Sequence, residues 1–304
     1  MRAKWMAAWS ILVPVLAVGC GSARGPVAPV AVKAPIKVSR CVMKFPDPRA
    51  AAAARVRLER DISRYVSKRP GRIVYGALDL VTGVSFGEGE HAHDIITASG
   101  AKVDILAALL LRGTGELDEE EHDLAARMIT ESDNSAADAL WSRVGGSMSD
   151  FYNRVGLRET TPGPGIYWGG TTTSPADRIR LMKVLVKGGR GLTAPDRRLV
   201  LDLMSRVQKD QSWGVSAAAR PGDRVALKNG WTPRPFVGNA SWAVTSYGRI
   251  VGPGRDLLLS VQTDHQPGEG AGIETIEGVA HLIGARLDTL SPTITRPCPT
   301  KPIA

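Results

Sequence analysis

The segment from Ser99 to Leu111 restricts the fold more than any other part of this 304-residue chain. Residues 105–111, ILAALLL, contain no polar side chain, so a helix formed here is apolar on every face. Such a helix is stable only in the middle of a domain, where other elements cover it on all sides. Hydrophobic residues make up 43% of the chain, which suffices for the large core that this requires and excludes disorder as the main state.

The order of the other expected elements indicates how that core is layered. Hydrophobic periodicity predicts a first helix over residues 47–68, a hairpin of strands over 72–80 and 84–88, and a last helix over 274–287. Three more strands are expected over 224–228, 240–246 and 256–263. Between the two groups of strands we expect helices over 99–111, 117–130, 135–144, 149–155, 175–186 and 195–207. The predicted fold class is α/β of the α+β type: a five-stranded, mainly antiparallel sheet flanked by the terminal helices, with an all-helical subdomain.

The N-terminus has the layout of an export signal. Arg2 and Lys4 precede an apolar stretch that ends in small residues before Cys20 and is too short for a comfortable transmembrane span. Residues 16–20, LAVGC, resemble a bacterial lipobox, in which the cysteine becomes the lipidated first residue, although Ala17 stands where leucine is usual. We expect a signal peptide over 1–19 and a lipid anchor on Cys20 at the outer face of the bacterial cytoplasmic membrane. Ordinary secretion is the alternative.

Two cysteines remain if Cys20 carries lipid. Cys41 and Cys298 lie at opposite ends of the chain, and an even pair in an oxidising compartment favours a disulfide that closes a very long loop. Two unpaired thiols are the alternative. Residues 20–46 are rich in Ala, Pro, Val and Gly and predict a flexible tether, the folded domain is expected over 47–290, and the proline-rich residues 291–304 indicate a C-terminal tail.

The charge and the histidines point to no further class of function. The net charge is +9, but the basic residues are spread along the chain without a run or interleaved aromatics, so no nucleic-acid binding is expected. His91, His93 and Asp94 lie close together, yet no further ligands are spaced to complete a metal site. We expect no metal and no cofactor.

Three short motifs carry candidate chemistry. In Ser99-Gly-Ala-Lys102, a spacing of three places a hydroxyl and an amine on the same helix face, and burial in an apolar helix lowers the pKa of a lysine. Taken alone, this motif is more typical of a capped helix with a snorkelling lysine. In Ser132-Asp-Asn134, Ser132 could relay a proton to a leaving group and Asn134 could orient the substrate, although the sequence is also a good helix cap.

The third motif, Lys228-Asn229-Gly230-Trp231, ends a predicted strand. A lysine there attracts a substrate carboxylate, and a glycine lets another backbone approach the strand edge closely. The backbone N–H groups of Ser99 and Trp231 would then hold an oxyanion between them. A basic residue that simply enters a turn is the alternative explanation of this motif.

The ordered set S-x-x-K, S-D-N and K-x-G resembles the signature of class A β-lactamases and penicillin-binding proteins. Residues 97–103, 128–138 and 171–177 resemble the surroundings of these motifs, so the resemblance covers roughly residues 47–290. It implies a monomeric serine hydrolase. Ser99, Lys102 and Ser132 would be catalytic. Asn134, Lys228, Asn229, Gly230 and Trp231 would contact a β-lactam or D-alanyl-peptide-like substrate.

Three departures from the family limit the predicted activity. Asn229 stands where the family has a hydroxyl residue that helps to hold the substrate carboxylate. No omega-loop E-x-x-L-N is present, and Glu159 aligns with an earlier, structural glutamate rather than with the one that activates water. The interval between Ser99 and Ser132 is also shorter than in well-known members. We therefore expect acylation with weak deacylation, and the alternative is a catalytically impaired envelope lipoprotein that binds a wall peptide or a protein partner.

Overall fold

The computed structural model describes residues 42–44, 47–112, 116–234, 241–290 and 293–296. The expectations for the signal peptide, for most of the tether and for Cys20, Cys41 and Cys298 lie outside these residues. Within the described ranges, no helix is both long enough and apolar enough to cross a membrane.

The predicted five-stranded antiparallel sheet is confirmed. Its strands are β2 (Arg72–Asp79), β3 (Ser85–Glu88), β6 (Arg224–Arg234), β7 (Ser241–Gly252) and β8 (Arg255–Gln266), in the order β3-β2-β8-β7-β6. The last three strands are longer than their apolar patterns indicate. The ladder between β6 and β7 runs without interruption from Arg224 to Arg234, so backbone pairing carries β6 through Asn229, Gly230 and Pro233, residue types that are depleted in strands.

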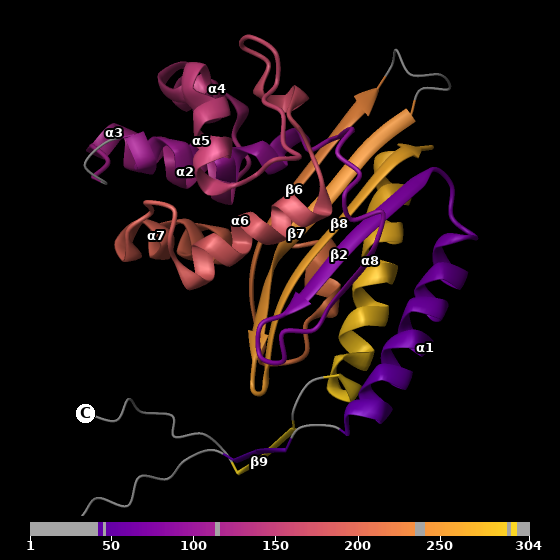
Figure 1. The fold of residues 1–304 in the computed structure, drawn as a ribbon. Coiled ribbons are helices and arrows are strands. Elements are labelled where there is room, and N and C mark those ends of the chain that lie inside the picture. The colour runs from indigo at the N-terminus through magenta and orange to yellow at the C-terminus, as the bar shows by residue number, and fades with distance from the viewer. Residues whose placement is uncertain (1–41, 45–46, 113–115, 235–240, 291–292, 297–304) are drawn as a thin grey trace, which may run out of the picture. The chain divides into compact units, whose positions relative to one another are not determined.

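Helices cover both faces of this sheet (Figure 1). On one face, α8 (Glu269–Arg286) packs on β7 and β8, and α1 (Pro48–Val66) packs on α8. On the other face lies α6 (Pro175–Lys187), with the helical subdomain beyond it. Each face has its own hydrophobic core, because alternate residues of a strand point to opposite sides: Leu257 and Leu259 join the core under α8, whereas Leu258 joins the core of the helical side.

The helical subdomain surrounds the apolar segment as predicted. The helix α2 (Ala101–Arg112) is buried along nearly its whole length. Its neighbours are α3 (Glu119–Thr130), α4 (Asn134–Val144), α5 (Met148–Val155) and α7 (Ala194–Ser205). The start of α6 is fixed by a side-chain cap, since the Ser174 hydroxyl accepts a hydrogen bond from the Asp177 amide.

Short elements that the hydrophobic pattern did not indicate complete the fold. The pair β4 (Ile95–Ile96) and β5 (Thr172–Thr173) ties the segment before α2 to the segment before α6. The pair β1 (Val42–Lys44) and β9 (Thr293–Arg296) lies in stretches expected to be tether and tail. Single 3-10 turns are η1 (Ala98–Gly100), η2 (Gly145–Ser147), η3 (Trp168–Gly170), η4 (Lys209–Gln211), η5 (Gly214–Ala218) and η6 (Leu287–Thr289).

Candidate active site

Ser99 lies in the turn η1, which leads directly into the buried helix α2. The turn is held by a hydrogen bond from the Gly100 amide to the Thr97 carbonyl (2.9 Å) and by one from the Tyr247 hydroxyl to the Gly100 carbonyl (2.9 Å). Gly230 of β6 lies against it so closely that a Cβ there would be 2.9 Å from the Ser99 nitrogen. The glycine of the third motif therefore lets the strand itself approach the Ser99 turn.

Lys102, one turn further along α2, is completely buried and makes three hydrogen bonds with residues of the second motif. Its Nζ donates to the Ser132 carbonyl (2.6 Å), to the Ser132 hydroxyl (3.1 Å) and to the Asn134 Oδ1 (2.7 Å). Burial lowers the pKa of Lys102 to about 7, although the carboxylates of Asp133 and Asp138 oppose the shift. An amine with this pKa can accept a proton near neutral pH.

Ser132 joins the first and third motifs. Its hydroxyl lies 3.1 Å from the Lys102 Nζ and 3.0 Å from the Lys228 Nζ. Its backbone φ is +60°, a left-handed conformation that is uncommon outside glycine. The next residue, Asp133, caps α4, because its side chain accepts a hydrogen bond from the Ala136 amide. This cap fixes Asp133 and thereby holds Ser132 in its left-handed conformation.

Lys228 is fully buried, and both burial and the nearby Lys102 lower its pKa well below the usual value. Two lysines thus share one serine hydroxyl, and mutual repulsion disfavours the state in which both carry charge. Since Lys228 Nζ also donates to the Asn229 carbonyl (3.2 Å), it is held in place by β6 itself.

Asn229 and Trp231 have side chains on the other face of β6 from Lys228, because residues alternate along a strand. The Asn229 amide nitrogen donates to the carbonyls of Gln211 (2.9 Å) and Trp213 (3.1 Å). Both of its donor hydrogens are therefore used in holding the η4–η5 segment, and a substrate contact by Asn229 stays a prediction. Trp231 packs edge-on against Trp213, with ring centroids 5.8 Å apart, and borders the cleft beside Ser99.

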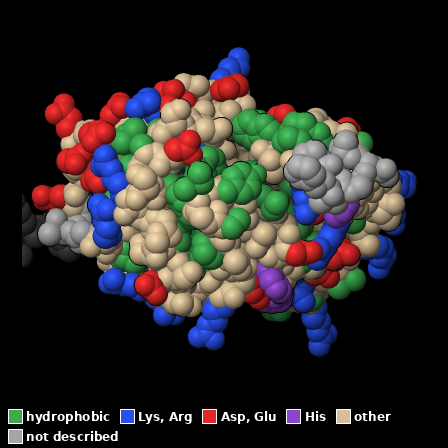
Figure 2. Space-filling model, turned by 90° about the horizontal axis from the view of Figure 1, so that it is seen from above, with side chains coloured by type: hydrophobic (Ala, Val, Ile, Leu, Met, Phe, Trp, Pro, Cys, Tyr) green, Lys and Arg blue, Asp and Glu red, His purple; other side chains and the backbone are tan. Residues whose placement is uncertain are grey.

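That cleft has a volume of about 430 Å³. Figure 2 shows the molecule from above, with hydrophobic side chains gathered near the middle of that face. The cleft contains Ser99, Asn134 and Trp231 of the predicted site. Its other lining residues are Ala98, Asp138, Ile166, Tyr167, Trp168, Gly169 and Thr232. Ile166 is 90% exposed and Tyr167 55% exposed, so one wall of the cleft is an apolar rim open to solvent.

Trp168 forms the inner part of that wall. Its ring centroid lies 4.8 Å from the Lys102 Nζ, and its indole N–H donates to the Asp138 Oδ1 at 2.7 Å. The sequence motifs did not indicate Asp138, although its position one helical turn after Asn134 places both side chains on the same face of α4. That spacing is the signal through which Asp138 could have been found.

Glu159 is occupied elsewhere. Its carboxylate accepts a short hydrogen bond from the Ser174 hydroxyl and lies 2.8 Å from the His91 Nδ1. Partial burial would raise the pKa of Glu159, but these two contacts outweigh it and lower the pKa. Asp94, three residues after His91, forms an ion pair with Arg72, in which the Arg72 Nη1 lies 2.6 Å from the Asp94 Oδ2. His91 and Asp94, two of the residues first considered as metal ligands, are thus engaged in separate contacts at the surface.

Behind the site, a buried ion pair connects α2 to α6. The Arg178 guanidinium lies 2.6 Å from the Asp104 carboxylate, and both side chains are completely buried. Tyr152 also donates to Asp104 (3.2 Å), and Arg178 donates to the hydroxyl of Thr173 (3.0 Å). Burial alone would lower the pKa of Arg178, but the Asp104 carboxylate outweighs it and raises that pKa. The network fixes the helix that carries Lys102.

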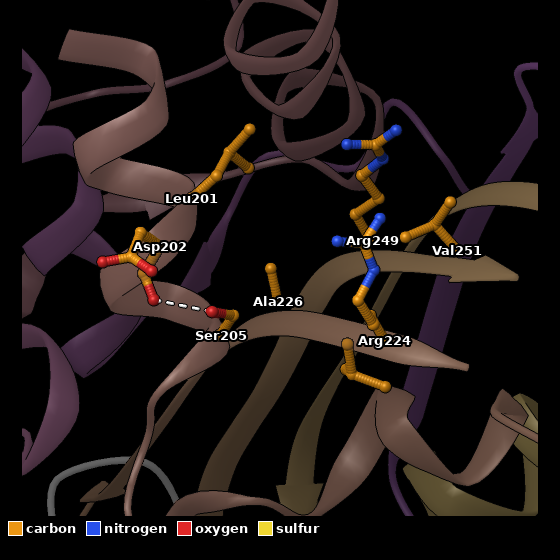
Figure 3. Close-up of a pocket in the computed structure, with 8 residues that line it drawn as sticks. Leu201, Asp202, Ser205, Arg224, Ala226, Arg249 and Val251 are labelled. Atoms are coloured by element: carbon orange, nitrogen blue, oxygen red, sulfur yellow. Dashed lines mark hydrogen bonds between the residues drawn. The ribbon is translucent and has the colours of Figure 1, made fainter. Parts of the chain in front are cut away.

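A second cavity, of about 230 Å³, lies between α7 and the strands β6 and β7 (Figure 3). Ser205 is the nucleophilic side chain in it, but its hydroxyl donates to the Asp202 carbonyl within α7 (2.7 Å). Arg249 pairs with Asp256 at 2.7 Å. None of the predicted site residues borders this cavity, so the cleft beside Ser99 is the candidate active site.

Comparisons with solved structures agree with this geometry. The chain superposes on PBP-A with a TM-score of 0.65 and 23% identity, over 77% of this chain and 97% of that one. It superposes on the TLA-3 extended-spectrum beta-lactamase with a TM-score of 0.67 and 15% identity, over 76% and 98% of the two chains. These similarities show that the fold is that of β-lactamases.

Sequence comparisons add a family and a group of relatives. The curated protein "Putative lipoprotein LppW" of Mycobacterium tuberculosis, like its counterpart in Mycobacterium bovis, is 33% identical over 208 residues, or 64% of this chain and 63% of the relative. The match thus spans less than two thirds of these relatives. A family model described as "Beta-lactamase enzyme family" matches residues 120–287, from α3 through the end of α8. Because that model covers more than half of the chain, this protein belongs to the beta-lactamase enzyme family.

Proposed function

We propose that the protein is a serine acyl-transfer enzyme in which Ser99 is the nucleophile and Lys102 its base. The observation that carries the proposal is the Ser132 hydroxyl, which lies within 3.1 Å of both Lys102 and Lys228. An arrangement of this kind serves proton transfer, because two amines of lowered pKa flank one hydroxyl that can pass a proton between them. A purely structural lysine would more often be paired with a carboxylate.

In the proposed acylation step, the Ser99 Oγ attacks the carbonyl carbon of a β-lactam or of a D-alanyl-peptide-like substrate. The Ser99 proton passes to the neutral Lys102 amine. The backbone N–H groups of Ser99 and Trp231 stabilise the oxyanion, and β6, as the edge strand of the sheet, has N–H groups that are not used by a neighbour on that side. The C–N bond then breaks, and the departing nitrogen takes a proton from Lys102 through Ser132. The product is an ester on Ser99.

Hydrolysis of that ester is proposed to be slow. It requires a base that removes a proton from water near the acyl carbon. Glu159 is held by Ser174 and His91, and the side of Lys102 that faces the loop is covered by the Trp168 ring. Both observations support a long-lived acyl-enzyme rather than rapid turnover.

Export and anchoring form a second part of the proposal. The curated relatives carry "lipoprotein" in their names, which supports lipidation at Cys20 and a place on the outer face of the cytoplasmic membrane. A monomeric chain is part of the proposal that rests on the family resemblance alone. The antiparallel pairing of Val42 with Arg296 supports a disulfide between Cys41 and Cys298, because each cysteine is close in sequence to this pair.

The experiment that tests the enzymatic proposal is intact-protein mass spectrometry after incubation with benzylpenicillin. We expect a lasting adduct of one penicillin per chain, which peptide mapping locates on Ser99 and which Ser99→Ala abolishes. Ser205→Ala, a change to the serine of the second cavity, should leave the adduct unaltered. Absence of an adduct with both benzylpenicillin and an activated ester would reject acyl transfer and favour a protein that binds a wall peptide without reaction.

A further inference from the structure

The cleft beside Ser99 has a chemical character that the general reaction does not explain. Among the described residues that line it, Asp138 alone carries a charge at neutral pH, although the whole chain has a net charge of +9. The remaining lining is apolar, aromatic or neutral and polar. A negative group in an otherwise uncharged cleft of a basic protein selects ligands by charge.

The Asp138 carboxylate is held by an uncharged neighbour, and the buried Lys102 amine interacts with it electrostatically. Its Oδ1 accepts the indole N–H of Trp168 at 2.7 Å, an uncharged donor, and its side chain is exposed in the cleft. The hydrogen bond fixes the direction of the carboxylate without bringing an opposite charge to it. Such a group forms a charge-assisted hydrogen bond with an ammonium donor.

Aromatic side chains stand beside that carboxylate. Tyr167 and Trp168 line the same cleft, and the Tyr167 ring rests over Gly170, where a Cβ would be 2.7 Å from its Cδ1. This close approach fixes the ring at the cleft wall. Aromatic faces attract cations and apolar groups alike, so a carboxylate next to them suits a ligand that carries an ammonium on an apolar body.

The position of Asp138 relative to Ser99 identifies the part of the substrate concerned. Asn134 and Asp138 are one turn apart on α4, and both border the cleft that contains Ser99. A group attached to the acyl carbonyl and passing Asn134 would meet Asp138 next. We propose that this site prefers acyl donors with a protonated amino group close to the acyl carbonyl, recognised by Asp138 and the aromatic wall of Tyr167 and Trp168.

Ampicillin and benzylpenicillin provide the test, because they differ by one amino group on an otherwise identical phenylacetyl side chain. The inference rests on the proposed acylation of Ser99, so the acylation rate constants of both compounds are measured at mildly acidic pH, where the amino group is protonated. Each is divided by the compound's rate of uncatalysed hydrolysis. We expect ampicillin to be favoured roughly three- to tenfold.

Asp138→Asn is the decisive variant, because asparagine can still accept the Trp168 hydrogen bond but lacks the charge. It should reduce the ratio of the normalised acylation rate constants, ampicillin over benzylpenicillin, towards one. Asp150→Asn, which removes an exposed carboxylate from the different helix α5, should leave the ratio unchanged. An equal ratio in wild type and Asp138→Asn overturns the inference while the proposed function stands.

A binding measurement separates the inference from the reaction. Calorimetric titration of Ser99→Ala with both compounds should show tighter binding of ampicillin, and the added change Asp138→Asn should remove that difference. Equal binding of the two compounds to Ser99→Ala would contradict the preference, even if Ser99 is the nucleophile. Absence of any adduct on wild-type Ser99, with the binding preference intact, would instead reject the proposed function alone.

Discussion

The helix α2 carries two buried charged regions that differ in one respect. Asp104 pairs with Arg178 at 2.6 Å, and Tyr152 and Thr173 complete the hydrogen bonds of that pair. Two residues earlier, Lys102 faces a hydroxyl, a carbonyl and an amide oxygen, with a second lysine on the same hydroxyl. The first region is compensated in charge, whereas the second has like charges together.

This difference indicates which region stabilises the fold and which is reserved for chemistry. A buried ion pair with complete hydrogen bonding holds its elements firmly, and removal of one partner leaves an unpaired charge. A buried lysine without a carboxylate partner weakens the folded state, and in return its pKa is lowered to about 7, where proton transfer is efficient. Loss of a charged side chain from the first region is therefore expected to lower the free energy of unfolding, and loss of Lys102 from the second is expected to raise it.

The largest expected effect is that of Asp104→Ala. It leaves the Arg178 guanidinium buried without its carboxylate, and we expect the free energy of unfolding to fall by about 3–5 kcal/mol. Urea denaturation followed by circular dichroism measures it. Asp202→Ala is the control, since the pair of Asp202 with Arg206 is 58% exposed on both sides and its loss should change little. Equal losses of stability in the two variants would contradict the idea that the buried Asp104–Arg178 pair stabilises the fold more than an exposed pair does.

Lys102→Met should act in the opposite direction. Methionine fills a similar volume without a charge to bury, so we expect the free energy of unfolding to rise by about 1–2 kcal/mol at neutral pH. The same variant should form no penicillin adduct, because Ser99 loses its base. A loss of stability similar to that of Asp104→Ala would mean that the Lys102 region is compensated after all.

The sequence holds no signal for the first of these regions, whereas the residues of the second stand in recognisable motifs. Lys102, Ser132 and Lys228 belong to short motifs whose residue types suggest their role locally. Asp104 and Arg178 are 74 positions apart, and no motif links them. Their pairing depends on where the fold places α6 relative to α2, which the apolar pattern of each helix does not specify.

The same distinction holds for the cleft and the sheet. The order of helices and strands follows from hydrophobic periodicity, so the five-stranded sheet could be predicted. The wall of the cleft could not, because residues 162–170 are mostly irregular and the partner of Trp168 is Asp138 on another element. The length of β6 was also underestimated, since pairing with β7 rather than strand propensity extends it.

The pH dependence of stability tests the lysine region again. In the folded protein the pKa of Lys102 is about 7, against 10.5 for an unperturbed lysine. Between these values the unfolded chain binds more protons, so stability rises with pH, by at most about 1.4 kcal/mol per pH unit for this one group. Below pH 7 both states are protonated and the contribution is constant.

The measurement is urea denaturation of wild type and Lys102→Met across that pH window. The difference between the two proteins should shrink as the pH rises, while the acylation rate of wild type increases through about pH 7 as Lys102 loses its proton. A difference that is independent of pH would mean that Lys102 keeps an ordinary pKa and is not the base.

The smallest expected effect concerns Tyr247, which connects the two regions. Its hydroxyl donates to the Gly100 carbonyl in the Ser99 turn, while the Arg178 guanidinium lies 5.4 Å from its ring centroid. Tyr247→Phe keeps the ring and removes one buried hydrogen bond, which should lower the free energy of unfolding by about 1 kcal/mol. The acylation rate should fall several-fold while substrate affinity is kept, because the turn that positions Ser99 loses an anchor. Equal losses in rate and affinity would show instead that the hydroxyl shapes the whole cleft rather than the nucleophile.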